Sequence, residues 1–122
     1  MRSDRTLKKH FNKLNKRFFD GQLPASTCVR WLDPDEDDPR LEDALFGYAD
    51  KAADGYHKYQ IVLSRKMCLP ASSRMTTLIH EMIHVYLELK DDHGEAFERV
   101  RLMLSDKGIF RKGAVIRGLT IF

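Results

Sequence analysis

The residues best suited to chemistry are two histidines four positions apart, His80 and His84, with Glu81 directly after the first. On an α-helix, side chains four positions apart lie one above the other on the same face. Both imidazoles can therefore bind one metal ion at the distance of about 2.0–2.1 Å that zinc–nitrogen bonds require. The two histidines also lie opposite the apolar stripe of the predicted helix, which argues against a role in the core. A chance match to so short a motif is the alternative.

A catalytic zinc ion needs a third protein ligand and one open position for water. We favour His93, because Asp91–Asp92 predicts a break in the helix after which the chain reverses, and Gly94 permits that reversal. The alternatives are that His93 is only a loop or N-cap residue and that the third ligand is Glu88 or Glu95.

An amphipathic helix is predicted near the start of the chain. Apolar residues recur at helical intervals from Leu7 to Phe18, and Asp4 is suited to be the N-cap. The glycine and proline within residues 20–24 then end the helix. The polar face of this helix is strongly basic. It carries five candidate nucleic-acid-binding residues: Arg5, Lys9, Lys13, Lys16 and Arg17.

Such a face can lie along a phosphate backbone, so DNA, single-stranded DNA in particular, is one candidate partner. The alternative is an ordinary solvated helix face, which we rate slightly ahead. A second basic cluster near the end of the chain extends the patch if the two regions meet in space. It consists of Lys107, Arg111, Lys112 and Arg117.

The remaining elements follow from apolar periodicity. Short strands are predicted at residues 27–32, 45–49 and 59–64, and a last strand at 114–122. The helix that carries the two histidines opens after Pro70 and keeps one apolar stripe from Met75 to Tyr86. A shorter helix runs from Ala96 to Leu104 and ends at Gly108. The acidic loop at residues 33–39 lacks the glycine and terminal glutamate of an EF-hand, so we favour a solvated turn over a calcium site.

The composition fits one domain over residues 1–122. Lys and Arg number 21 and Asp and Glu number 18, so the net charge is +3, too weak a bias to indicate nucleic acid by itself. Two cysteines, Cys28 and Cys68, exclude a zinc ribbon and argue against a disulfide framework, so we expect buried free thiols. No apolar run approaches the length of about 20 residues that crosses a bilayer, and we expect a cytoplasmic protein with no membrane partner.

Several phrases occur together in an order that resembles the SprT-like metalloprotease family, over about residues 8–104. The most specific are the phrase at residues 19–24 and the His-Gly-x-x-Phe sequence after the histidine helix. The matching segments are Phe11-Asn12, Phe18-Phe19-Asp20-Gly21-Gln22-Leu23-Pro24, Val29-Arg30-Trp31, Gly47, Ile61-Val62-Leu63-Ser64, Thr77-Leu78-Ile79-His80-Glu81-Met82-Ile83-His84 and His93-Gly94-Glu95-Ala96-Phe97.

This resemblance implies that His80, His84 and His93 are zinc ligands and that Glu81 is the catalytic acid and base. It implies an α+β, zincin-like fold with an N-terminal helix, a small mainly antiparallel sheet, the zinc helix and a closing helix. One zinc ion would lower the pKa of bound water towards about 7 and polarise the scissile carbonyl, while Glu81 takes the proton. A second oxyanion donor is expected among four tyrosines: Tyr48, Tyr56, Tyr59 and Tyr86.

We therefore expect a zinc-dependent endopeptidase that hydrolyses flexible or DNA-associated proteins, with the substrate extended along an edge strand. The chain resembles a bare catalytic core, because the additional segments of many relatives are missing. Two alternatives remain. The first is a non-enzymatic, zinc-containing module that binds nucleic acid, and the second is an accessory peptidase of a phage or mobile element.

Overall fold

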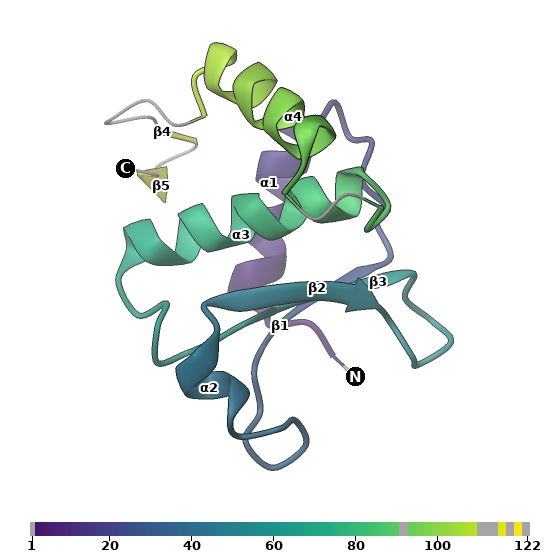
Figure 1. Ribbon diagram of the computed structural model, residues 1–122, viewed down its shortest axis with the longest axis vertical. Coiled ribbons are helices and arrows are strands. Elements are labelled where there is room, and N and C mark those ends of the chain that lie inside the picture. Colours follow the sequence, from purple (N-terminus) through teal and green to yellow (C-terminus); the bar gives the residue numbers. More distant parts are fainter. Residues whose placement is uncertain (1, 91–92, 110–114, 117–118, 121–122) are drawn as a thin grey trace.

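A computed structural model describes residues 2–90, 93–109, 115–116 and 119–120. The described chain contains helices and short strands (Figure 1). The helices are α1 (Arg5–Phe18), α2 (Leu41–Ala44), α3 (Ala71–Tyr86) and α4 (Glu95–Asp106). The strands are β1 (Thr27–Trp31), β2 (Gly47–Lys51), β3 (Tyr59–Leu63), β4 (Val115–Ile116) and β5 (Leu119–Thr120). Along the chain they follow one another in the order α1, β1, α2, β2, β3, α3, α4, β4, β5.

The main sheet has three strands in the order β1-β3-β2. β2 and β3 form an antiparallel hairpin, whereas β1 pairs with β3 in parallel. The prediction of a mainly antiparallel sheet is therefore wrong, and the sheet is mixed. The cause is that the connection through α2 leads from β1 to β2 at the far edge of the sheet, and the β2–β3 hairpin then returns the chain between them, so that β3 runs in the same direction as β1. β2 is consequently an edge strand of this sheet.

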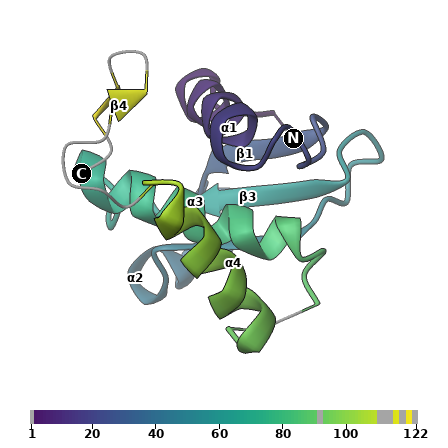
Figure 2. The ribbon, with the colours of Figure 1, turned by 90° about the horizontal axis from the view of Figure 1, so that it is seen from above.

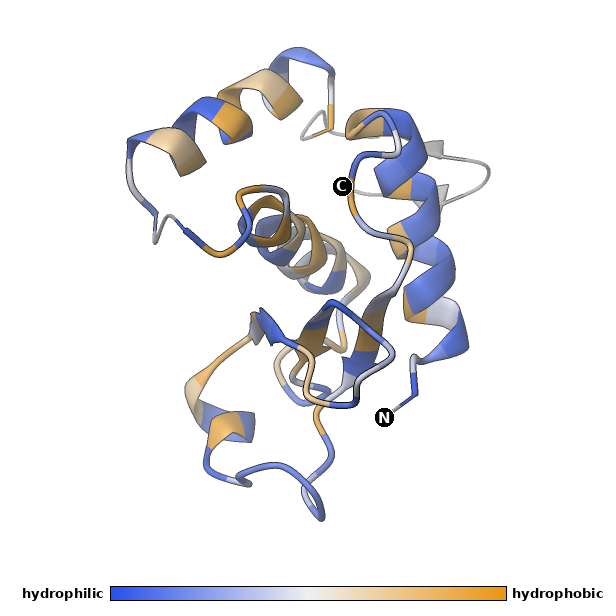
Figure 3. Cartoon of the chain, turned by 90° about the vertical axis from the view of Figure 1, so that its right-hand side faces the viewer, coloured by the Kyte–Doolittle hydropathy of each residue, from blue (hydrophilic) through white to orange (hydrophobic). Residues whose placement is uncertain are grey.

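The helix α1 forms as its sequence predicts. The Asp4 carboxylate accepts a hydrogen bond from the Leu7 amide at 3.0 Å and so caps the helix. The apolar stripe faces inward and the charged face outward (Figure 3). The helix ends where Asp20 and Gly21 adopt left-handed backbone angles, with φ of 53° and 71°.

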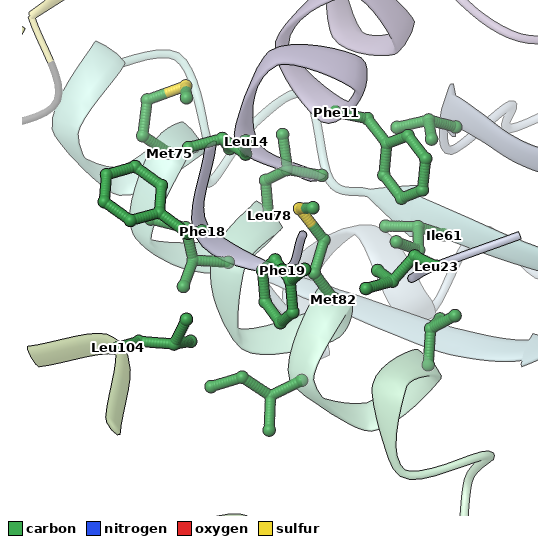
Figure 4. Close-up of a cluster of buried hydrophobic side chains, with 14 of the residues drawn as sticks. Phe11, Leu14, Phe18, Phe19, Leu23, Ile61, Met75, Leu78, Met82 and Leu104 are labelled. Atoms are coloured by element: carbon green, nitrogen blue, oxygen red, sulfur yellow. The ribbon is translucent and has the colours of Figure 1, made fainter. Parts of the chain in front are cut away.

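Asn15 holds the turn that follows α1. Its side chain is only 8% exposed, and it both accepts a hydrogen bond from the Leu23 amide and donates one to the Leu23 carbonyl, each at 3.1 Å. This paired contact folds the turn back onto the helix. Phe19 and Leu23 thereby reach the hydrophobic core (Figure 4).

The core lies between the sheet and the helices. α3 lies over β2 and β3, α1 lies along β1, and α4 lies over α3 (Figures 1 and 2). The predicted apolar stripe of α3 is confirmed, because Met75, Leu78 and Met82 are all buried in the cluster of Figure 4. One face of α3 is thus fixed in the core, which determines the direction of its opposite face.

The end of α4 and the state of the two cysteines both match the predictions from the sequence. Gly108 has a φ of 89°, and the amides of Gly108 and Ile109 donate to the carbonyls of Ser105 and Leu104, which ends the helix. Cys28 and Cys68 are buried free thiols, as expected.

In place of the single strand predicted at 114–122, the described residues form a short antiparallel pair, β4 and β5, and the rest of that range lies outside the described residues.

The acidic loop is a structured turn. The Asp37 carboxylate accepts two hydrogen bonds from the Arg30 guanidinium, at 2.7 and 2.9 Å, and one from the Asp33 amide. Asp37 is therefore neutralised by the protein itself. Among the described residues, no helix is long and apolar enough to pass through a membrane.

Candidate metal centre

Three histidine side chains converge on one point. His80 and His84 come from α3, and His93 comes from the segment just before α4. The His93 Nε2 atom lies 2.8 Å from His80 Nε2 and 3.1 Å from His84 Nε2. One ligand atom from each of the three residues lies within 4.8 Å of the others, so the group can hold a metal ion. The structure thus brings together all three histidines that the sequence singled out.

The donor set fits zinc. Zinc commonly takes imidazole nitrogens as ligands at about 2.0–2.1 Å each, and the distances of 2.8 and 3.1 Å from His93 Nε2 to the other two nitrogens place them within reach of one shared ion. Burial, followed by the positive charges that His84 and His93 can carry, lowers the pKa of His80 to about 4. Near neutral pH this imidazole is uncharged, which is the form that binds a metal ion.

The segment that delivers His93 has an unusual backbone. Glu88, Leu89 and His93 all have positive φ values, of 55°, 62° and 65°, although none is a glycine. The chain reverses through these residues. The predicted role of Gly94 in the reversal is wrong, because its φ is −84° and it serves as the N-cap of α4. A non-glycine residue in the left-handed region is strained, and such strain is common at functional sites.

The other acidic candidates lie elsewhere. Glu88 is exposed and pairs with Lys90 at 3.0 Å, and Glu95 pairs with Arg99 at 2.9 Å. Neither belongs to the group of three histidines. Asp91 and Asp92 lie outside the described residues. Within the described part of the chain, His93 is thus the third member of the group.

Glu81 lies beside the histidines in a buried position. It is 6% exposed, and it lines a cavity of about 410 Å³ together with all three imidazoles. Burial of the carboxylate raises its pKa to about 7. A carboxylate that faces a metal-binding cavity in this way can accept and return a proton near neutral pH.

Phe97 supports the three imidazoles from within α4. Its ring is 5% exposed, and its centroid lies 4.9 Å from those of His80 and His84 and 5.0 Å from that of His93. The sequence analysis placed Phe97 in the predicted helix at residues 96–104 and in the His-Gly-x-x-Phe phrase, but it assigned the side chain no contact with the histidines. Its spacing of four residues from His93 was the available signal of a contact with that ligand.

The opposite wall of the cavity is the start of β2. Leu45, Gly47, Tyr48 and Ala49 line it, together with Leu89. Of the four tyrosines considered as oxyanion donors, Tyr48 is the one that lines this cavity. Tyr56 is 87% exposed on the hairpin, Tyr59 is buried in the core, and Tyr86 packs against Phe19.

Gly47 sets how closely β2 approaches α3. A Cβ atom at this position would lie 2.8 Å from the Val62 carbonyl oxygen and 2.9 Å from both the Leu63 Cδ2 and Thr77 Cγ2 atoms. The first of these atoms belongs to the backbone of the paired strand. Only glycine allows the cleft to be this narrow.

The basic face of α1 is separate from this cavity. Arg5, Lys9, Lys16 and Arg17 are exposed and Lys13 is partly buried. Burial, and then the positive charges of Arg74, Lys13 and Lys9, lower the pKa of His10 in their midst. Arg74 of α3 is thus within electrostatic reach of His10, although its guanidinium donates hydrogen bonds to the Cys68 and Leu69 carbonyls. Of the second basic cluster, Lys107 donates a hydrogen bond to the Phe18 carbonyl at 3.0 Å, whereas residues 111, 112 and 117 lie outside the described residues.

Comparison with known protein families gives one match. Residues 7–114 match the model of the SprT-like family, which covers most of the chain. No curated protein and no solved structure matches. The matched region includes most of α1, the three-stranded sheet, the three histidines and α4.

Proposed function

The chain belongs to the SprT-like family, and we propose that it is a zinc-dependent endopeptidase. We base this on one observation above all, the burial of Glu81 in the same cavity as His80, His84 and His93. A purely structural zinc site has no use for a buried acid beside the metal. A catalytic zinc site and a structural zinc site therefore differ in whether such a buried acid is present.

His80, His84 and His93 would hold the ion, which supplies Lewis-acid chemistry by acidifying water and polarising a carbonyl. Glu81 accepts a proton from the attacking water and then donates it to the departing amine. Its low exposure keeps other water away from the carboxylate. Tyr48 lines the same cavity, but its hydroxyl interacts with the Arg30 side chain on the face of the sheet opposite to α3, so we do not assign it as an oxyanion donor.

The substrate that fits this cleft is an extended polypeptide. β2 is the edge strand of the sheet and its residues line the cavity of the histidines. A peptide that adds to a sheet edge makes main-chain hydrogen bonds and must be locally unfolded to do so. Flexible or unfolded protein segments are accordingly the proposed substrates.

The test of catalysis is Glu81→Gln. Purified zinc-loaded protein is incubated with unfolded casein, and cleavage is followed by gel electrophoresis and mass spectrometry. The amide cannot accept a proton, so turnover falls by at least 100-fold while one zinc ion per chain remains bound. Glu98→Gln, which changes an exposed acid outside the cavity, retains activity. Undiminished cleavage by Glu81→Gln would exclude this residue as the proton acceptor.

The test of the ligand set is His93→Ala. Zinc stoichiometry and affinity are measured by competition with a chromogenic chelator, with His10→Ala as the matched control. Loss of one of three protein ligands weakens zinc binding strongly, whereas the control binds zinc as the wild type does. If His93→Ala binds zinc with unchanged affinity, Glu88 or Glu95 takes its place.

As a second activity we propose DNA binding by the basic face of α1, on which Arg5, Lys9, Lys16 and Arg17 are exposed. Replacing Lys9 and Lys16 by glutamine should weaken binding to a single-stranded oligonucleotide. It should also reduce the slope of log affinity against log salt by about 0.7 for each lost phosphate contact. The matched control replaces Lys66 and Lys90, which are exposed elsewhere. Equal loss in both variants would indicate only a general charge effect.

A further inference from the structure

A groove leaves the metal cavity along the first half of α3. Next to the histidines lies a hollow of about 300 Å³ lined by Phe46, Gly47, Thr76 and Thr77 together with His80 and Glu81. A further hollow of about 230 Å³ continues it and shares Phe46, Thr76 and Thr77 with it. The shared residues show that the hollows form one groove between α3 and the start of β2.

Apart from Glu81 and His80, the residues that line this groove are uncharged. Ser72 and Ser73 complete the far hollow. The Thr77 hydroxyl lies 3.6 Å from the Cys68 thiol, and the Thr77 methyl group is turned towards Gly47. Phe46 forms the opposite wall and leaves 45% of its surface exposed. A large apolar side chain left half in water beside a cleft is suited to contact with a ligand.

The distance along α3 fixes where a bound peptide would meet this hollow. Thr76 precedes His80 by one turn, which is a rise of about 6 Å. An extended peptide advances about 3.3 Å per residue. The hollow beneath Phe46 therefore lies about two residues from the point that faces the histidines.

We propose that the hollow formed by Phe46, Thr76 and Thr77 binds an apolar side chain of the polypeptide substrate, at one fixed position within about two residues of the cleaved bond. This inference rests on the proposed endopeptidase function, since it names a specificity determinant of the same site. The occupant is the substrate because the hollow is continuous with the metal cavity and shares Gly47, His80 and Glu81 with it.

The first experiment measures binding without turnover. Zinc-loaded Glu81→Gln is titrated against fluorescein-labelled alanine-based peptides that carry one leucine or one aspartate at each position in turn, by fluorescence polarisation. The tightest leucine peptide should bind roughly tenfold better than its aspartate counterpart, as one hydrophobic contact allows. Adding Phe46→Ala should remove this preference. Adding Leu102→Ala, an exposed apolar residue of α4 outside the groove, should preserve it.

The second experiment changes the selectivity instead of removing it. Thr76 is exposed, so Thr76→Glu introduces a carboxylate into the hollow without disturbing the core. In a peptide library cut by this variant, lysine or arginine should replace apolar residues at the same position relative to the cleaved bond. A wild-type profile without an apolar preference, or an unchanged profile in Thr76→Glu, would overturn the inference.

The two proposals fail in different ways. If Glu81→Gln prefers the leucine peptide and the wild type cleaves nothing, the apolar hollow stands as a peptide-binding site and the endopeptidase proposal fails. If the wild type cleaves but leucine and aspartate peptides bind equally, the endopeptidase proposal stands and the hollow is not a specificity site.

Discussion

Replacing Phe97 by alanine should weaken metal binding more than its effect on stability alone explains. The ring contacts all three imidazoles, with centroids 4.9–5.0 Å away. Each such aromatic contact contributes about 0.5–1.5 kcal/mol. Removing a buried Phe also costs about 3–5 kcal/mol of folding free energy. If about 1.5–3 kcal/mol of the contact energy orients the imidazoles, zinc affinity falls about 10- to 100-fold in Phe97→Ala.

The assay separates orientation from stability by a matched variant. Leu104→Ala removes a fully buried residue of the same helix that lies about two turns beyond Phe97, and it should cost about 2–5 kcal/mol. Urea unfolding of the metal-free proteins gives the stability loss, and chelator competition at a temperature where both variants are folded gives zinc affinity. Equal zinc affinities in the two variants would refute the idea that Phe97 orients the ligands.

Three further predictions concern the scaffold. Gly47→Ala should lower the free energy of unfolding by about 1–3 kcal/mol, seen in urea denaturation, and reduce peptide binding by widening the cleft. Asn15→Ala should cost about 2–3 kcal/mol in the same assay, whereas Asn12→Ala, an exposed asparagine of the same helix, should cost little. The Arg30 hydrogen bonds lower the pKa of Asp37 from its ordinary value of 3.8, so Asp37 stabilises the fold above that pH and this contribution is lost as pH falls through the folded-state pKa. Asp37→Asn should therefore be less stable than the wild type at pH 7 by about 1–2 kcal/mol, and thermal melts should show the difference closing below about pH 4.

Local signals made much of this fold predictable. The cap at Asp4, the stripe of α3 and the stop at Gly108 each depend on residues within a few positions of one another, and all three are confirmed. The spacing of His80 and His84 on a helix fixed their common face in the same local way.

Long-range pairing was not predictable from the sequence. Nothing within residues 27–31 shows whether a strand will pair in parallel, so the direction of β1 against β3 was misjudged. The short helix α2 carries no apolar stripe and has no buried residue, so it left no signal. The left-handed angles of Glu88, Leu89 and His93 also went unpredicted, because non-glycine residues adopt them only when the surrounding structure imposes them.

The metal ligands and the cleft wall come from different stretches of the chain. His80, His84, His93 and Phe97 lie within a single helix–loop–helix segment, whereas Phe46 and Tyr48 belong to a strand and its approach far earlier in the sequence. Substitutions at residues 45–49 would thus change the cleft wall while the segment that carries the three histidines keeps its own sequence. Under the proposed function, selectivity for substrates and affinity for the metal ion can therefore vary independently.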